Sequence, residues 1–363
     1  MIKNIQYLRC VAALLVVFAH SNLQIFGVSA RFTNVGGFGV DLFFVISGFI
    51  MPYILFGGLY RQGSIATNNA AGFFWRRIAR IMPMYFLVTA VAVLISYLVM
   101  SGAIHNPDND LMYTFSPSRV DWSWFVESVT FTHWERAPIL GVGWSLQVEF
   151  FFYLAITFGL LLGAQKLESI EFAILGFFFV FILFGSINTT NSMIAQNFCN
   201  PLVIEFLLGL FLYRMVSNGQ LMNTYAAITT IVLFLPIFMY IELKDVIRII
   251  IPSLDRAVQW GFPALLLVWA AISLEGKVKE FKLVSLLGDA SYSLYLIHAI
   301  VAPLYIFYMH KLGISLAVGP VIYLLAMLTI CSAAGIAAHL YVEKPINNFV
   351  KKYTGRRRVL AEA

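Results

Sequence analysis

The sequence predicts an all-α integral membrane protein with about ten transmembrane helices and both termini in the cytoplasm. Of its 363 residues, 60% are hydrophobic and 12% are charged, against about 45–50% and about 25% in an ordinary soluble domain. The apolar residues form runs long enough to cross a bilayer, which takes about 20 residues per helix. Runs such as 172–184 do not alternate polar and apolar positions, as barrel strands do, so we expect helical spans.

The apolar runs place the predicted spans along the whole chain. Their ranges are 6–28, 37–58, 83–104, 143–164, 172–188, 200–215, 223–242, 258–274, 288–309 and 316–340. Most of the 24 Lys and Arg residues then fall on one side, which the positive-inside rule assigns to the cytoplasm. Residues 1–345 therefore form one transmembrane domain, and residues 346–363 form a basic cytoplasmic tail.

Charge, cysteine pattern and the start of the chain exclude several other classes. The net charge of +6 reflects these basic loops and the contact with a lipid bilayer, so no nucleic-acid partner is expected. Cys10, Cys199 and Cys331 have no metal-ligand spacing, and no metal is predicted. Residues 1–30 resemble a signal peptide in outline, but the apolar run is longer than usual, which favours an uncleaved span.

The longest predicted outer loop, residues 105–142, combines tryptophans with carboxylates. Trp122, Trp124 and Trp134 lie among Asp121, Glu127 and further acidic residues. Aromatic rings beside carboxylates can stack on a sugar and hydrogen-bond its hydroxyls. An interfacial aromatic belt explains the same residues equally well, so the sequence leaves both interpretations open.

Four ionisable residues fall within predicted spans at comparable depth. His20 lies about 16 Å deeper than Arg9 along the first span, at 1.5 Å per residue. Asp41 and Glu149 lie one to two turns below the outer face, and His298 lies near mid-depth. Because charged groups within a bilayer usually mark function, the set predicts a site with candidate bases and carboxylates. A purely structural polar network is the alternative.

A basic segment precedes the third predicted span. It carries Arg76, Arg77 and Arg80 at helical spacing. The first predicted span enters from the same face of the membrane, so Arg9 is expected to add to this basic patch. Arginines at this spacing suit bidentate contacts to phosphate, although basic residues also simply anchor topology. A phosphate-binding mouth below a histidine and carboxylate site suits a donor with an anionic head and a long thin arm, which is the shape of coenzyme A.

These residues also resemble the motifs of acyltransferase family 3, a family of membrane O-acyltransferases that modify surface polysaccharides. The matching segments, in chain order, are Leu8-Arg9 followed after ten residues by His20, then Gly39–Phe49, Arg77–Pro83, Trp144–Glu149, Ser291–His298 and Tyr341–Pro345. The matches extend over nearly the whole chain. The short opening segment Ile5–Arg9 and the single-domain layout look most like the exopolysaccharide-type members.

The resemblance implies a function and a set of roles. The protein would move an acyl group, by default acetyl, from acyl-CoA to a hydroxyl of a carbohydrate or lipid-linked glycan at the bacterial inner membrane. Polysaccharide-assembly proteins would be further partners. His20 would be the catalytic histidine, Arg9 and Arg80 would support CoA binding, and Glu149 belongs to a motif associated with activity.

Combining both lines of argument, we expect two groups of site residues. Acyl-CoA phosphates would bind Arg9, Arg76, Arg77 and Arg80. The reaction site would comprise the catalytic residues His20, Asp41 and Glu149, with Trp144, Ser145, Tyr295 and His298 binding substrate or supporting them. His20 would either take the hydroxyl proton as general base or carry the acyl group, with Glu149 or Asp41 orienting it.

Two serines and two other functions complete the sequence-based expectations. Ser47 and Ser145 lie in no nucleophile elbow, so helix packing or a hydrogen bond is the better interpretation.

A proton-coupled transporter or exporter of a sugar-containing substrate would also place histidines and carboxylates at mid-depth. A structural subunit of a polysaccharide-assembly complex is the third interpretation.

Overall fold

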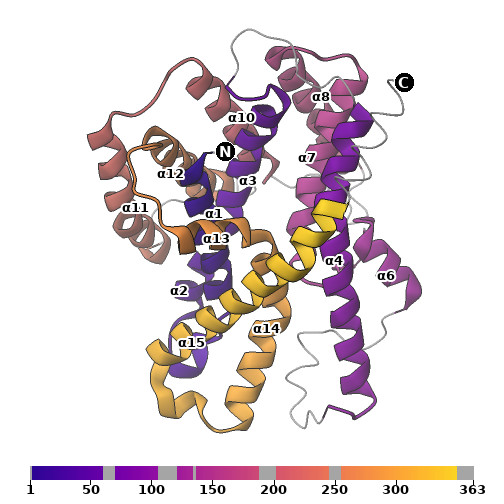
Figure 1. Cartoon of the computed structure of the whole chain (residues 1–363), viewed down its shortest axis with the longest axis vertical. Helices are drawn as coiled ribbons and strands as arrows, with labels where there is room; N and C mark the ends of the chain where they lie inside the picture. Colours follow the sequence, from indigo (N-terminus) through magenta and orange to yellow (C-terminus); the bar gives the residue numbers. More distant parts are fainter. Residues whose placement is uncertain are drawn as a thin grey trace.

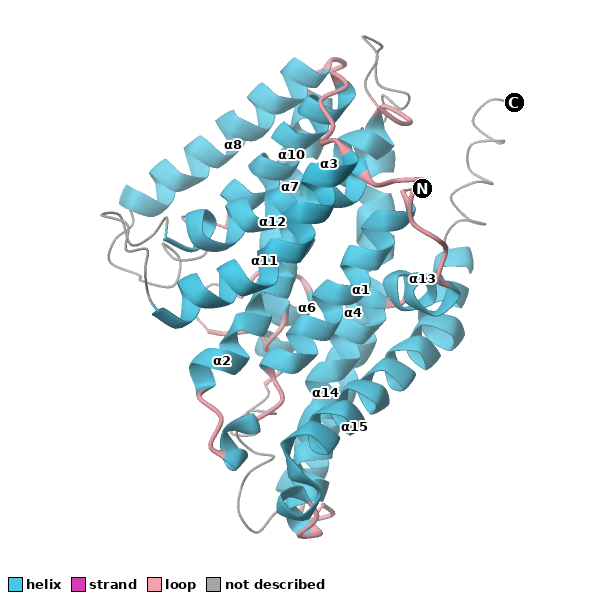
Figure 2. Ribbon diagram, turned by 90° about the vertical axis from the view of Figure 1, so that its left-hand side faces the viewer, coloured by secondary structure: helices cyan, strands magenta, loops and turns pink. Residues whose placement is uncertain are grey.

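The computed structural model describes residues 2–59, 70–104, 121–133, 136–187, 202–244 and 255–349. Every regular element in these ranges is helical, and Figure 2 shows no strand among the described parts. The predicted all-α class is therefore confirmed. The predicted basic tail lies almost wholly outside the described residues.

Within the described ranges, ten helices of 12 residues or more form the bundle. They are α1 (Lys3–Ala19), α3 (Phe38–Leu55), α4 (Ala70–Met100), α7 (Gly143–Leu161), α8 (Leu167–Ile187), α10 (Val203–Ser217), α11 (Thr224–Lys244), α12 (Phe262–Ser273), α14 (Ser291–Lys311) and α15 (Ser315–Ala338). Each predicted span overlaps one of them. The shorter described elements are η1 (Leu23–Phe26), α2 (Ala30–Asn34), η2 (Val35–Gly37), α6 (Trp122–Val129), η4 (Ala257–Gly261), α13 (Lys282–Asp289) and η5 (His339–Glu343).

Length and hydropathy support membrane insertion. Within the described ranges, five segments are long and apolar enough to cross a bilayer: Ala30–Leu55, Ala70–Met100, Gly143–Leu161, Ser291–Lys311 and Ala317–Phe349. The outward faces carry large apolar side chains, such as Phe172 on α8, which is 75% exposed. So much exposed apolar surface fits a lipid environment. The count of ten spans and the cytoplasmic placement of the termini stay predictions.

The arrangement places α1 and α3 in the middle of the bundle. Figure 1 shows α4 and α7 on one side of them and α11 and α12 on the other, with α15 crossing in front. Helix α1 contacts α3, α12, α13, α14 and α15, so it touches two of the other helices that carry motif residues, α3 and α14. The two central helices therefore bring together residues that lie far apart in the sequence.

Glycines allow the closest approaches of these helices. A Cβ atom at Gly39 would overlap the carbonyl oxygen of Ala12, so only glycine lets α3 lie directly against α1. The same holds for Gly48 against the carbonyl of Phe206, where α3 meets α10. The glycines of the second-span motif thus have a packing role, independent of any role in catalysis.

A carboxylate from a distant part of the sequence caps the N-terminus of α1. The backbone N–H groups of Lys3 and Asn4 donate to the two carboxylate oxygens of Glu275, at 2.8 and 2.9 Å. These are donors that a helix start leaves without partners, and a negative charge is favourable there. The ammonium of Lys3 lies 2.7 Å from Glu280 and holds the pKa of that carboxyl below its usual range. The start of α1 is thereby anchored to the connection between α12 and α13.

Two predicted span boundaries are wrong. Helix α1 ends at Ala19 rather than near residue 28, because the chain leaves the helix at His20 and Asn22 adopts a left-handed conformation with φ 51°. Helix α4 begins at Ala70 rather than at residue 83, and it continues through Pro83. Arg76, Arg77 and Arg80 therefore lie on the first turns of a long helix rather than on a segment before it.

Candidate active site

A cavity of about 340 Å³ lies between α1, α3, α4, α7 and α14. Its polar lining residues are Gln6, Arg9, Ser47, Tyr53, Arg80, Ser145, Glu149, Tyr153, Tyr292 and Tyr295. On α3 the lining extends from Val40 to Ile54, which corresponds to about 21 Å at 1.5 Å per residue. The cavity is therefore long and narrow, and it follows the central helix pair.

Two arginines project into this cavity without ion-pair partners. Arg9 of α1 and Arg80 of α4 both line it. Among the described residues, neither guanidinium lies within salt-bridge distance of a carboxylate. An arginine in a confined site needs a counter-charge, so the two side chains make this part of the cavity suitable for an anionic group.

The other two candidate arginines are placed differently. Arg77 is buried and does not line the cavity; its guanidinium lies 5.5 Å from the ring centre of Phe73 and 6.0 Å from that of Tyr153. Arg76 is exposed on the helix surface. The predicted set of four thus separates into two residues in the cavity, one packed behind it and one at the surface.

Glu149 lies in the middle of the cavity wall and is held by two hydroxyl groups. Ser47 Oγ donates to its Oε1 at 3.0 Å, and the Tyr153 hydroxyl donates to the same oxygen at 2.5 Å. Ser47 therefore makes a hydrogen bond between α3 and α7, as the sequence interpretation favoured. The carboxylate faces the same cavity as Arg9 and Arg80 and can influence which charges are accepted there.

A second polar contact lines the cavity at the start of α7. The hydroxyl groups of Ser145 and Tyr295 lie 2.5 Å apart. Both hydroxyls also lie within hydrogen-bond distance of the carbonyl of Val142, at 3.0 Å from Ser145 and 3.3 Å from Tyr295, so one donates to the carbonyl and the other to its neighbour. The ring centre of Tyr295 lies 5.7 Å from that of His298, one helical turn further along α14.

Beyond Tyr295 the two predicted histidines lie side by side. Their ring centres are 5.1 Å apart, with His20 following the last residue of α1 and His298 in the middle of α14. His20 Nδ1 lies 2.8 Å from the carbonyl oxygen of Val16. A carbonyl oxygen only accepts, so Nδ1 carries the hydrogen and Nε2 carries the lone pair. Neutral His20 is thus oriented as a base by its own helix.

The carboxylates predicted to orient His20 have other partners. Asp41 is fully buried and accepts two hydrogen bonds from Arg256, at 3.0 and 2.9 Å. Glu149 is held by Ser47 and Tyr153, as described above. In the described structure no hydrogen bond joins either acid to His20, so the predicted carboxylate–histidine contact is replaced by the Val16 carbonyl.

Arg256 is the main residue of this region that the sequence analysis did not single out. Its guanidinium lies 4.7 Å from the ring centre of Trp260 and 6.0 Å from that of Trp144, which gives Trp144 a place in this cluster. Fully buried Glu205 lies close to both Asp41 and Arg256. Arg256 lies just before the predicted span 258–274, in a stretch that the hydropathy pattern assigns to a loop.

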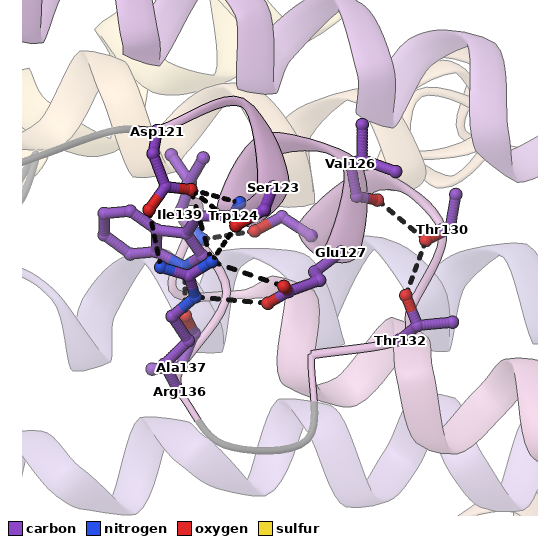
Figure 3. A network of polar contacts seen from close by, with 11 residues as sticks. Asp121, Ser123, Trp124, Val126, Glu127, Thr130, Thr132, Arg136, Ala137 and Ile139 are labelled. Atoms are coloured by element: carbon purple, nitrogen blue, oxygen red, sulfur yellow. Dashed lines mark hydrogen bonds and ion pairs between the residues drawn. The ribbon is translucent and has the colours of Figure 1, made fainter.

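The predicted aromatic and acidic outer loop forms its own network at α6, shown in Figure 3. Arg136 donates to Asp121, Ser123 and Glu127 and lies over the ring of Trp124. Asp121 caps the start of α6 by accepting from the N–H of Trp124 at 2.6 Å. The described acids of this loop are therefore engaged within the protein. Trp134 and Glu135 lie outside the described residues.

The late motifs also have a packing role. The Tyr292 hydroxyl donates to the carbonyl of Ile81 at 2.7 Å and ties α14 to α4. Ser293 donates to Glu343 at 2.6 Å, and His339 Nδ1 lies 2.8 Å from the same carboxylate oxygen. The closing motif thereby holds α14 in the position from which Tyr295 and His298 face the site.

Comparison with known proteins supports an enzymatic reading of this geometry. Residues 2–337 match a family profile described as an acyltransferase domain. The exopolysaccharide production protein ExoZ of Rhizobium meliloti is 27% identical over 316 residues, which cover 86% of this chain and 90% of that protein. The peptidoglycan O-acetyltransferase OatA of Listeria monocytogenes is 27% identical over 42% of this chain and 23% of its own length. No solved structure matches.

Proposed function

The chain belongs to the acyltransferase family whose domain it matches, and we propose that it moves an acyl group from acyl-CoA to a carbohydrate hydroxyl. That it is a membrane O-acyltransferase follows from the family and from the relatives. The proposal concerns the donor, the acceptor and the residues that bind them. The observation that carries it is the narrow cavity with Arg9 and Arg80 in its wall and two histidines beyond its end.

The donor fits the cavity in both charge and shape. The phosphates of coenzyme A would take the counter-charge positions at Arg9 and Arg80, with Arg76 at the surface steering the anionic head. Arg77 would hold this part of α4 in place from behind. Arg9 and His20 are about 16 Å apart along α1, at 1.5 Å per residue, so a long arm is needed to bring the thioester to the histidine.

The acceptor is proposed from the relatives and from the exposure of His20. One relative is named for exopolysaccharide production and another for peptidoglycan O-acetylation, so we propose a surface or exported carbohydrate, free or lipid-linked. His20 is exposed, unlike His298, and is open to a hydroxyl arriving from outside the bundle. Location as a multi-pass protein of the bacterial inner membrane, with polysaccharide-assembly proteins as partners, belongs to the same proposal.

The chemistry rests on His20. Its Nε2 lone pair either removes the proton of the acceptor hydroxyl or attacks the thioester itself. In both cases the bond between the acyl carbon and sulfur breaks, and the thiolate of coenzyme A takes up a proton. Glu149 would not contact His20. It would contribute its negative charge to the cavity and hold the hydroxyls of Ser47 and Tyr153 in place.

The test is turnover of radiolabelled acetyl-CoA by the purified protein, with wild type beside His20→Ala and Arg80→Ala. We expect turnover by wild type, none above background by His20→Ala, and weakened CoA binding by Arg80→Ala. If wild type neither binds acetyl-CoA nor releases acetyl from it, the donor assignment is wrong. Sugar flux into proteoliposomes without CoA would then favour the transporter interpretation.

A further inference from the structure

The two histidines present the same chemical feature twice. His298 Nδ1 lies 3.2 Å from the carbonyl of Leu294, so its Nδ1 carries the hydrogen, as in His20. Its Nε2 is then a lone-pair acceptor, and it is buried with no hydrogen-bond partner in the described part of the chain. Buried polar atoms almost always have a partner, so an orphaned base 5.1 Å from the catalytic ring needs an explanation.

Direct transfer needs one group, a base that removes the proton of the acceptor hydroxyl. Transfer in two steps needs two groups, a nucleophile that carries the acyl group and a base for the acceptor. Once an acyl group is attached to Nε2 of His20, that atom can no longer accept the proton of the acceptor hydroxyl. Building on the proposed function, we propose that His20 carries the acyl group and that His298 is the base for the second step. The pair thereby divides the two half-reactions between two imidazoles.

The first step forms one bond and breaks one. The Nε2 lone pair of His20 attacks the thioester carbon, the carbon–sulfur bond breaks, and the thiolate of coenzyme A leaves and takes a proton from water. The acylated ring is cationic and keeps its Nδ1 hydrogen on the Val16 carbonyl. This contact favours the cation and fixes the ring orientation.

The second step restores the enzyme. The acceptor hydroxyl gives its proton to Nε2 of His298 while its oxygen bonds to the acyl carbon, and the bond from that carbon to Nε2 of His20 breaks. His298 then returns the proton to the hydroxide left by the first step. The sum is acyl-CoA plus alcohol giving ester plus coenzyme A.

Other candidate bases near the histidines are already occupied. Asp41 is paired with Arg256, and Glu149 accepts from two hydroxyls. The Tyr295 hydroxyl is hydrogen-bonded to Ser145 and lies 3.3 Å from the carbonyl oxygen of Val142. His298 differs from these groups in that its Nε2 accepts no hydrogen bond among the described residues and its ring lies directly beside that of His20.

The test separates the two steps in single-turnover experiments with acetyl-CoA. Release of coenzyme A reports the first step, and loss of enzyme-bound acetyl, followed by intact mass, reports the second. Water serves as the acceptor that needs a base, and hydroxylamine as the nucleophile that does not. In His298→Ala we expect release at the wild-type rate, a discharge to water slowed about 10²- to 10⁴-fold, and rapid discharge by hydroxylamine. Added imidazole should restore the discharge to water.

Controls make every outcome decisive. His310→Ala, at the exposed end of the same helix, should discharge like wild type. His298→Gln keeps a similar side-chain volume but removes the base. If His298→Ala does not bind CoA, this second variant takes its place and should show the same slow discharge to water. Two results would overturn the inference. In the first, a variant that binds acetyl-CoA loses its enzyme-bound acetyl to water at the wild-type rate. In the second, a variant that binds acetyl-CoA releases no coenzyme A from it, so the first step itself has failed. If wild type itself releases no coenzyme A, the proposed function fails instead.

Discussion

Two regions of the described structure differ in how their charged and basic side chains are paired. Around the cavity, Arg9, Arg80 and the Nε2 atom of His298 have no protein partner among the described residues. At Asp41 and at α6, each arginine is bound to carboxylates and covered by indole rings. Groups without partners are costly in the free protein, so they are the ones expected to meet substrate. Paired groups are expected to support stability.

The largest effect should come from His20, the reactive member of the first region. His20→Ala should lower turnover of acetyl-CoA by at least about 10²- to 10⁴-fold, because it removes the group that reacts. Thermal stability should hardly change, since the ring is exposed and bonded only to its own helix. Turnover and melting temperature in the same detergent check this. A large fall in melting temperature would place His20 with the structural groups.

The second effect tests the paired region. Arg256→Met leaves the carboxylate of Asp41 buried and unpaired, which should destabilise the protein by about 3–5 kcal/mol. Melting temperature measures the loss. The double variant Asp41→Asn with Arg256→Met removes both charges and should recover a large part of it. If Arg256→Met is stable but inactive, Arg256 instead belongs with the substrate-binding groups.

The third effect concerns the donor. Arg80→Ala should raise the KM for acetyl-CoA about 10- to 100-fold, the equivalent of losing a charged hydrogen bond worth about 1.5–3 kcal/mol, with stability unchanged. Arg76→Ala is the matched control from the same helix; its exposed position predicts a smaller, salt-dependent change. Equal effects of the two variants would contradict the assignment of Arg80 to the cavity.

The sequence predicts where a residue lies along a helix better than it predicts which groups that residue contacts. Hydropathy and motif spacing predicted the helices and placed His20 near His298, because position along a helix follows from residue number. Arg256 was missed because nothing in a linear pattern shows that a loop cation folds back onto Asp41. The Val16 carbonyl was also missed, because a backbone acceptor has no sequence signature. Partners that arise from tertiary packing or from the main chain are the part that needs a structure.

The smallest expected effect is a local one at α6. The N–H of Trp124 and then the guanidinium of Arg136 lower the pKa of Asp121 to about 2 from its ordinary value of 3.8. Because the folded pKa is depressed, the contribution of Asp121 is present above pH 4 and is lost as pH falls through about 2. Hydrogen exchange of α6 amides should therefore quicken in that window while α3 stays protected. Asp121→Asn should show no such pH dependence, and if α6 and α3 respond together, the network is not a local support.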